Sequence, residues 1–255
     1  MAILRRSGRK SGRGGSWSRC PDCAEILPGE DVTRNHKVCP ACGHHYPNTV
    51  EERMALLLDE GSFAELDGLL ETADVLRFKG AHRYKDQLSA ARKRSNSVES
   101  VRAGTALVEG QRVAVGFVDT AFLQGSLGCV AAERLCGVFE LAAQEKLPAV
   151  MVTAGGGARH AEGVLALSQV ARLAGARDAV RESGVAFLSV LVAPLPGGVA
   201  QGYAFSGDVN LAEPGLVEGD GGGDTDALLH QGLVDRVVFR AELKAELSRL
   251  LRLLT

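Results

Sequence analysis

The sequence has no apolar run that approaches the roughly 20 residues needed for a membrane-spanning helix. It also lacks the G-x-S-x-G motif of serine hydrolases and the G-x-x-x-x-G-K-S/T loop that binds nucleotide phosphates. We find no convincing pair of a nucleophile and a base along the chain. Chemistry in this protein would therefore have to come from backbone dipoles and from the substrate itself.

The chain also lacks a strong overall charge, and its net charge of -2 argues against bulk affinity for nucleic acid or membranes. Its 45% hydrophobic and 24% charged residues are typical of a soluble globular protein with a large core. We therefore expect a cytoplasmic protein without a membrane span.

The first residues, in contrast, contain no acid and many bases. The basic residues before Cys20 are Arg5, Arg6, Arg9, Lys10, Arg13 and Arg19. We interpret residues 1–16 as a disordered, solubilising tail. Two alternatives remain open, which are weak contact with nucleic acid or another acidic partner, and a remnant of a plastid transit peptide.

Four of the six cysteines have the spacing of a metal site. Cys20 and Cys23 form one C-x-x-C pair, and Cys39 and Cys42 form the second after fifteen intervening residues. This arrangement predicts a zinc ribbon over residues 17–47, in which four thiolates hold one structural Zn²⁺. The alternative, a pair of disulfides, requires an oxidising compartment that nothing else in the sequence indicates.

The remaining chain, residues 48–255, predicts an α/β core. Thr49-Val50-Glu51-Glu52 is a capping-box pattern, which predicts a short helix that ends at Gly61. The residues from 90 to 104 predict a helix or a mobile loop. We expect further strands at 105–108, 113–119, 149–152, 185–193, 207–212 and 233–239, and helices at 130–144, 199–205 and 240–254.

The stretch from Ala149 to Gln169 is the most informative part of this core. A buried strand is followed by three glycines, 155–157, and then by a helix whose apolar face we expect at Val164, Leu165, Leu167 and Val170. Glycines before a helix can aim bare N–H groups at a negative oxygen. The simpler interpretation is an ordinary glycine-rich turn.

The same order of strand, glycine turn and helix occurs three times. The other two turns are Gln124–Gly128 and Pro194–Gly198. Strands that alternate with helices favour parallel pairing, and the repetition predicts an internal structural repeat. Residues 218–226 hold four glycines and four acids and predict a flexible loop.

Several motifs together carry a family resemblance. They are Cys39-Pro-Ala-Cys42-Gly-His-His45, Asp59-Glu-Gly61-Ser62-Phe63, Phe122-Leu-Gln-Gly-Ser-Leu-Gly128, Gly156-Gly-Ala-Arg159 with Glu162-Gly163, Pro194 to Gly198, and Gly207-Asp208 with Ala212-Glu213-Pro214. In this order they resemble the β subunit of bacterial-type acetyl-CoA carboxylase carboxyltransferase.

The resemblance implies a crotonase-like spiral of ββα units and a carboxyl transfer from carboxybiotin, on a biotin carboxyl carrier protein, to acetyl-CoA. The product would be malonyl-CoA, and an α subunit would complete an α2β2 assembly. Gly156 and Gly157 are then the expected catalytic residues, because their N–H groups would form an oxyanion hole. The expected substrate-binding residues are Gly125, Ser126, Gly128, Arg159, Gly197 and Gly198. For Arg159, an ion pair with Glu162 and contact with a CoA phosphate both stay open.

The chain also departs from the family pattern. Gly155 replaces a serine, His160 replaces a methionine and Gln124 replaces a glycine. The family segment G-F-A-G-x-R-V-I with a further helix does not follow Pro214. Two alternatives therefore stay open, which are a divergent paralogue with another acyl-thioester enolate reaction such as decarboxylation, and a non-catalytic zinc-ribbon scaffold.

Overall fold

The computed structural model describes residues 17–66, 68–195, 201–216 and 225–255. The predicted basic tail, Gly197, Gly198 and most of the predicted loop at 218–226 lie outside these residues. The chain divides into two compact units, with the boundary between Tyr46 and Pro47. Among the described residues, no helix is long and apolar enough to cross a membrane.

The first unit is built from two short strands, one helix and two tight turns. Strands β1 (Trp17–Arg19) and β2 (Ile26–Pro28) pair antiparallel, and helix α1 (Gly29–Arg34) follows them. One turn is closed by Cys20 N–H donating to Glu25 O at 2.8 Å, and the other by Cys39 N–H donating to His44 O at 2.8 Å. Each C-x-x-C pair therefore lies on its own turn.

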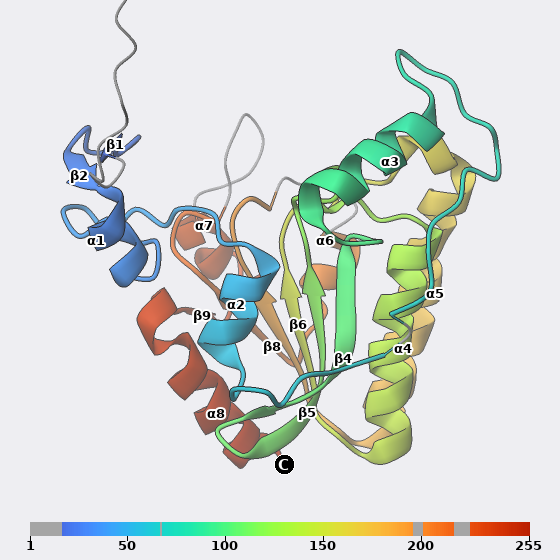
Figure 1. Ribbon diagram of the computed structural model, residues 1–255. Coiled ribbons are helices and arrows are strands. Elements are labelled where there is room, and N and C mark those ends of the chain that lie inside the picture. The colour runs from blue at the N-terminus through green and yellow to red at the C-terminus, as the bar shows by residue number, and fades with distance from the viewer. Residues whose placement is uncertain (1–16, 67, 196–200, 217–224) are drawn as a thin grey trace, which may run out of the picture. The chain divides into compact units, whose positions relative to one another are not determined.

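The second unit contains a seven-stranded sheet in sequence order (Figure 1). The strands are β3 (Ala64–Glu65), β4 (Val101–Val108), β5 (Gln111–Val118), β6 (Ala149–Thr153), β7 (Phe187–Leu191), β8 (Val209–Ala212) and β9 (Arg236–Val237). The first three pair antiparallel, and β5 to β9 pair parallel. Strands β4 and β5 form an antiparallel hairpin, and the α/β core predicted from the alternating strands and helices is present.

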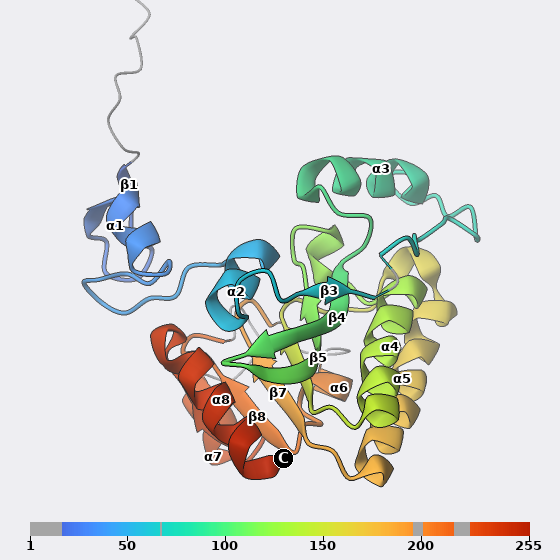
Figure 2. The ribbon, with the colours of Figure 1, turned by 60° about the horizontal axis from the view of Figure 1, so that its bottom comes forward.

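Helices cover both faces of this sheet (Figure 2). Helices α4 (Cys129–Glu145) and α5 (Val164–Ser183) lie on one face, and α2 (Val50–Leu57) and α8 (Leu243–Leu254) lie on the other. An apolar cluster lies on each face of the sheet. One contains residues of β6 and α8, and the other contains residues of β6 and α4. Parallel strands that are buried on both faces have nearly continuous apolar sequences, and β6 is an example.

The capping box that opens α2 is confirmed. Thr49 Oγ1 accepts from Glu52 N–H at 3.2 Å, and Thr49 N–H donates to Glu52 Oε2 at 2.9 Å. The helix ends at Leu57, however, and not at Gly61 as expected.

Strand β4 begins at Val101, four residues before the predicted start at Thr105. Gly104 is the last residue of the stretch predicted as a helix or a mobile loop, but it lies inside this strand, opposite Glu65 of β3. A Cβ atom at Gly104 would overlap the Ala64 carbonyl, so the glycine permits the close approach of β3.

The predicted apolar face of α5 is confirmed only at Val170, which is half-buried and packs against the apolar cluster around β6 and α4. Val164 is 73% exposed and Leu167 is 58% exposed. The buried residues of α5 are Ala166, Gln169, Leu173 and Val180. Of these, Leu173 and Val180 belong to the apolar cluster that also contains residues of α4.

The segment from 77 to 104 and the C-terminal part also differ in detail from expectation. Helix α3 (Tyr84–Ser95) settles the choice between a helix and a loop, and it begins before residue 90. Strand β9 covers only two of the seven residues predicted at 233–239. The remaining short elements are α6 (Gln201–Ala204), α7 (Thr225–His230) and the 3₁₀ turns Leu123–Gly125, His160–Glu162 and Arg240–Glu242.

Glu213, which follows β8, ties the C-terminal part to α2. Its carboxylate is fully buried and accepts from Arg53 of α2 and from Arg240, whose Nη2 lies 2.8 Å from Oε2. Burial lowers the pKa of Arg53. The resemblance motif Ala-Glu-Pro therefore marks a structural ion-pair cluster in this chain.

Candidate functional site

Two of the predicted glycine turns lie side by side. They follow β5 and β6, which are adjacent parallel strands, so their carboxyl ends meet at one edge of the sheet. Leu127 N–H donates to Gly157 O, and Arg159 N–H donates to Leu127 O, both at 2.9 Å. The turns that the sequence shows as separate repeats thus form one hydrogen-bonded unit.

The close contact between these turns requires glycine. Gly155 has φ +63°, and a Cβ atom there would overlap the Gln124 carbonyl oxygen. Gly125 has φ +68°, and a Cβ atom there would lie 3.0 Å from Ala154 O. Gly125 therefore has a packing role between the turns.

Gly128 has a similar packing role on the other side. A Cβ atom at Gly128 would lie 2.5 Å from Glu162 Oε1 and 2.7 Å from Arg159 Nη1. This space belongs to an ion pair inside the protein. Substrate contact by Gly125 and Gly128 stays a prediction.

Gly156 and Gly157 lie in the second glycine turn, at the surface of a pocket. Gly156 is buried with φ +108°, Gly157 is exposed, and both line a pocket. Within residues 17–66, 68–195, 201–216 and 225–255, neither N–H group donates a hydrogen bond. Because free backbone donors are costly to leave without a partner, they are available to an oxygen of a ligand.

The pocket has a volume of about 680 Å³, within the usual range for a small-molecule site. Helix α3 forms one wall, and the glycine turns form the other; Figure 1 shows α3 beside this end of the sheet. The residues that line this pocket include Tyr84, Arg94, Ser126, Gly156, Gly157, Arg159 and His160.

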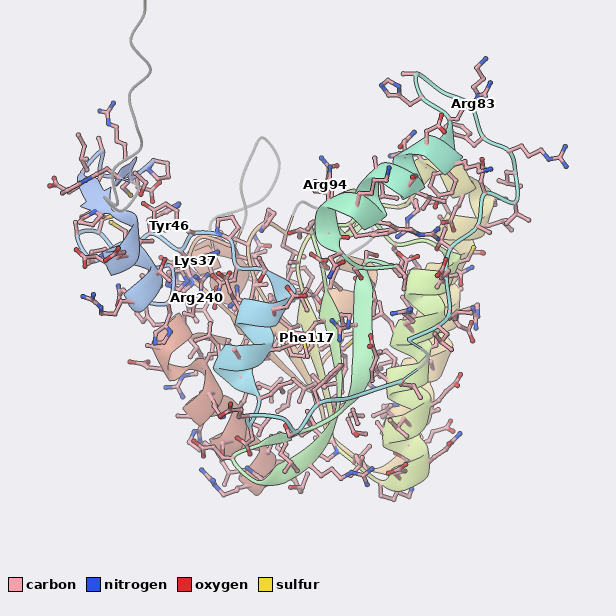
Figure 3. All side chains as sticks on the ribbon, in the orientation of Figure 1. Lys37, Tyr46, Arg83, Arg94, Phe117 and Arg240 are labelled. Carbon is pink, nitrogen blue, oxygen red and sulfur yellow. The ribbon has the colours of Figure 1, made fainter. Side chains whose placement is uncertain are left out.

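Arg94 gives the α3 wall a fixed positive charge. It lies at one end of α3, and Arg83 lies at the other end (Figure 3). Its Nε and Nη2 donate to Ala121 O at 3.1 and 2.8 Å. These bonds hold the exposed guanidinium at the edge of the pocket.

Arg159 is turned into the protein, although part of it lines the pocket. It is 3% exposed, and its Nη2 donates to Glu99 Oε1 at 2.5 Å and to Ser126 O at 2.7 Å. Its Nη1 donates to Glu99 Oε2 at 3.0 Å and to Glu162 Oε1 at 3.3 Å. The guanidinium is therefore engaged by buried acids, which favours the ion-pair interpretation over contact with a CoA phosphate.

Glu162 extends this network to two helices. Its Oε1 accepts from Tyr84 Oη of α3 at 2.6 Å, and its Oε2 accepts from Cys129 N–H at the start of α4 at 2.6 Å. A carboxylate at a helix N-terminus satisfies an unpaired donor and complements the helix dipole. One buried network thus connects both glycine turns, α3 and α4.

The pKa values agree with a network of ionised groups. Burial alone would raise the pKa of Glu99, but the hydrogen bonds from Arg159 outweigh burial and hold it below the ordinary value. Burial and the bond to Glu162 raise the pKa of Tyr84. Tyr84 thus stays a neutral hydrogen-bond donor.

Sequence reasoning did not identify Glu99 and Tyr84 as parts of the site. Both are far from the glycines in the sequence. Tyr84 ends a spaced pattern, Asp74, Leu76, Phe78 and Tyr84, that resembles the same family, but the pattern assigns it no role, and Glu99 belongs to no recognisable motif. The only local signal was the spacing between Arg159 and Glu162, three residues apart on one turn.

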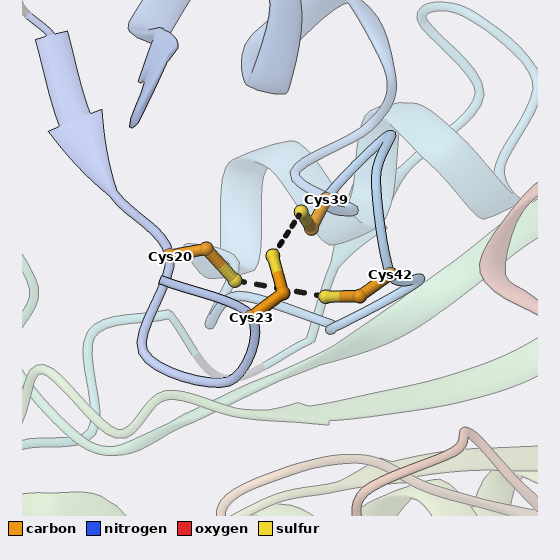
Figure 4. A group of neighbouring side chains, drawn as sticks. All are labelled: Cys20, Cys23, Cys39 and Cys42. Atoms are coloured by element: carbon orange, nitrogen blue, oxygen red, sulfur yellow. Dashed lines mark hydrogen bonds between the residues drawn. The ribbon is translucent and has the colours of Figure 1, made fainter. Parts of the chain in front are cut away.

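The four predicted metal-binding cysteines are brought together in the first unit (Figure 4). Their sulfur atoms all lie within 4.8 Å of one another, with Cys20 Sγ 3.7 Å from Cys42 Sγ and Cys23 Sγ 3.9 Å from Cys39 Sγ. A tetrahedral zinc ion with Zn–S bonds of about 2.3 Å separates its sulfurs by about 3.8 Å. The cluster therefore fits one tetrahedral Zn²⁺.

His44 lies outside this sulfur cluster and contacts Asp22 of the first turn. Its Nδ1 is 2.8 Å from Asp22 Oδ2. With four thiolates in place, the metal has no open position for a substrate.

Removal of zinc is expected to unfold the first unit and leave the second folded. A ribbon this small has little core, so metal binding supplies its folding free energy. Cys39→Ser should reduce bound zinc from about one ion per chain to near zero, measured by mass spectrometry. Limited proteolysis should then cut within residues 17–46 and spare residues 47–255.

Cys129→Ser is the matched control, because Cys129 lies outside the sulfur cluster. This variant should keep its zinc. Unchanged zinc content in Cys39→Ser would contradict the assignment of the ribbon.

Two protein-family models match this chain. The Acetyl-CoA carboxylase zinc finger domain matches residues 17–42, and the Carboxyl transferase domain matches residues 47–208. Solved structures share the fold at 20–22% identity, including a Pseudomonas malonate decarboxylase heterotetramer in complex with malonate. The match to that structure has a TM-score of 0.62 and covers 81% of this chain and 82% of the matched chain.

Another fold neighbour is the β subunit of geranyl-CoA carboxylase from P. aeruginosa. It has a TM-score of 0.58 and 20% identity, and the match covers 79% of this chain and 38% of that chain. These likenesses confirm the crotonase-like fold that the resemblance implied.

Curated relatives match both the ribbon and the core. The acetyl-coenzyme A carboxylase carboxyl transferase subunit beta of Citrifermentans bemidjiense is 35% identical over 94% of this chain and 91% of that protein. The same subunit of Sorangium cellulosum is 36% identical over 98% and 93%. These matches support the carboxyltransferase interpretation over a zinc-ribbon scaffold. The chain therefore belongs to the family of acetyl-coenzyme A carboxylase carboxyl transferase beta subunits.

Proposed function

We propose that this chain transfers a carboxyl group from carboxybiotin to acetyl-CoA, giving malonyl-CoA, as the β subunit of a two-subunit carboxyltransferase. Family membership supports this reaction, and one structural observation supports the assignment of particular residues to it. That observation is the pair of N–H groups at Gly156 and Gly157, which line the pocket and have no partner among the described residues.

In this proposal, the N–H groups of Gly156 and Gly157 bind the thioester oxygen of acetyl-CoA. The negative charge on that oxygen grows as the enolate forms, so the donors stabilise the transition state more than the bound substrate. One such donor is typically worth about 3 kcal/mol of activation free energy. Carboxybiotin, when bound, supplies the carboxyl group and a base for the acetyl proton.

The remaining residues of the turns hold the two turns in place in this proposal. Ser126 O accepts from Arg159, so the first turn is fastened to the buried network rather than free to move with the substrate. Gly125 and Gly128 allow the two turns to approach each other. Holding both turns at fixed separation keeps the donors aligned with the reacting oxygen.

In the proposed assembly, partner chains supply the biotin cofactor and the rest of the active site. A biotin carboxyl carrier protein would bring the cofactor, and an α subunit would complete the active site in an α2β2 complex. The relatives are named as beta subunits, which supports a partner chain. We also propose the boundaries of a tail at 1–16, a structural zinc ribbon at 17–47 and a catalytic domain at 48–255.

Gly157→Val tests the oxyanion hole without disturbing the fold. Gly157 has an ordinary backbone conformation, and a Cβ atom there meets nothing within 4 Å. A valine side chain would project into the space that the thioester needs. We expect malonyl-CoA formation by the αβ complex to fall by about 10²–10³-fold.

Gly175→Ala is the matched control, because Gly175 is an exposed glycine of α5 whose added Cβ atom also meets nothing within 4 Å. It should keep full activity. The catalytic assignment fails if Gly157→Val forms malonyl-CoA at the rate of the parent protein.

A further inference from the structure

Among the described residues, the pocket lining includes one histidine, His160. Four of its lining residues carry titratable groups, which are Tyr84, Arg94, Arg159 and His160. Arginine stays charged at any pH that a protein tolerates. Tyr84 donates its hydroxyl to Glu162 and has a raised pKa. His160 is therefore the remaining candidate for proton transfer in the described lining.

The position of His160 is fixed by the second glycine turn. It follows Arg159, whose N–H donates to Leu127 O at 2.9 Å, and its own carbonyl accepts from Gly163 N–H at 3.0 Å. The backbone at His160 is thus tied to the same turn that presents Gly157, three residues earlier.

The imidazole of His160, unlike its backbone, is free to meet a ligand. The residue is exposed and lines the pocket. Within the described part of the chain, its ring has no hydrogen-bond or ion-pair partner. A neutral imidazole offers one basic nitrogen and one N–H group. The pocket therefore combines N–H donors for an oxyanion with a base, none of which has a partner among the described residues.

We propose that His160 is a catalytic residue that gives this chain a proton-transfer reaction of its own, the enolisation of acyl thioesters without biotin. The proposal rests on the proposed function, because it places the thioester oxygen at Gly156 and Gly157. It also goes beyond the proposed function, because in carboxyl transfer carboxybiotin, when bound, would supply the base for the acetyl proton.

The reaction is balanced without any further reactant. The basic nitrogen of His160 takes a proton from the methyl carbon of the acetyl thioester. The C–H electron pair forms the C=C bond of the enolate, and the carbonyl pair moves to the oxygen held by Gly156 and Gly157. The imidazolium exchanges its proton with solvent and returns one to the carbon, so in D₂O the net change is one C–H replaced by C–D.

His160 is also a point at which this chain departs from the family that it resembles, whose motif has methionine there. Met fills a similar space but has no basic nitrogen, so His160→Met removes the proton transfer and keeps the shape of the wall. His160→Gln is a second variant that keeps a polar side chain. Because His160 is exposed, neither change is expected to disturb folding.

The test measures deuterium uptake into the methyl group of acetyl-CoA in D₂O, by mass spectrometry, with the αβ complex and no biotin. We expect uptake by the parent complex and a loss of about 10²–10⁴-fold in His160→Met and His160→Gln. His230→Gln, which replaces an exposed histidine outside the pocket, should exchange like the parent.

Malonyl-CoA formation with carboxybiotin is measured on the same samples, which separates the two claims. Uptake that His160→Met does not reduce, or no uptake by a parent complex that forms malonyl-CoA, would overturn the role of His160. A parent complex that exchanges deuterium but forms no malonyl-CoA would instead overturn the proposed function and leave the role of His160 standing.

Discussion

Arg159→Met is expected to lower the free energy of unfolding by about 3–5 kcal/mol and to abolish most carboxyl transfer. Methionine preserves the apolar stem of the arginine but leaves Glu99, which is 0% exposed, without its cation. An uncompensated buried carboxylate is far more costly than the loss of an ordinary hydrogen bond. Chemical unfolding and the malonyl-CoA assay, both with purified variants, measure the two effects.

The activity should fall because Arg159 joins the two glycine turns. Its side chain holds Ser126 O at 2.7 Å, while its backbone N–H holds Leu127 O at 2.9 Å. Arg159→Met removes the side-chain bond and keeps the backbone bond, so the first turn at Ser126 can shift against Gly156 and Gly157. A displacement of about 1 Å at a reacting centre can cost about 100-fold in rate.

Two controls separate position from stability. Arg172→Met removes an ion pair with Glu133 in which both side chains are 47% exposed, so its effect on stability should stay below about 1 kcal/mol. Leu247→Ala creates a cavity under α8 and should destabilise by about 2–5 kcal/mol while leaving the catalytic rate below the melting temperature unchanged. If Arg159→Met also keeps the parent rate, Arg159 is a structural residue only.

The same network predicts how stability depends on pH. The folded-state pKa of Glu99 lies below its ordinary value, so the ionised carboxylate stabilises the folded protein. This contribution is complete above the pKa of the unfolded chain and is lost as the pH falls through the lower folded value. Glu99→Gln should flatten the acid limb of a stability–pH curve, because glutamine cannot titrate.

The sequence predicts the local parts of this site well. The spacing of the four cysteines predicts the sulfur cluster, since tight turns bring C-x-x-C pairs to one point without help from distant residues. The capping box at Thr49 and the strand before Gly155 depend in the same way on neighbouring residues. These features follow from periodicity and turn chemistry alone.

The buried network could not be predicted, because it joins residues that only the fold brings together. Glu99 and Arg159 are sixty positions apart in the chain, and Tyr84 and Glu162 are seventy-eight apart. The exposed face of α5 was missed for a related reason. Its apolar residues form a helical pattern, but the fold decides which of them are buried, and Leu173 and Val180 are the ones that enter the cluster with α4.

The contact between Gln124 and Gly155 explains two departures from the family pattern together. The family motifs have a glycine in place of Gln124 and a serine in place of Gly155. Here Leu123, Gln124 and Gly125 all have positive φ values, of 44°, 57° and 68°, and the Gln124 carbonyl occupies the space of a Cβ atom at Gly155. A side chain at 155 is thus incompatible with this conformation of the first turn.

Gly155→Ser is therefore expected to destabilise the protein by about 2–3 kcal/mol and to lower malonyl-CoA formation by about 100-fold. Gly184→Ala is the control for backbone strain alone, because Gly184 has φ +75° but open space around its Cβ position. This variant should lower the free energy of unfolding by only about 1–2 kcal/mol and keep full activity.

Adding Gln124→Gly to Gly155→Ser should restore part of both losses, since glycine frees the first turn to move its carbonyl away. A double-mutant cycle on unfolding free energies should show coupling above about 0.5 kcal/mol. Strictly additive effects would mean that the two positions vary independently and that the turns do not constrain each other.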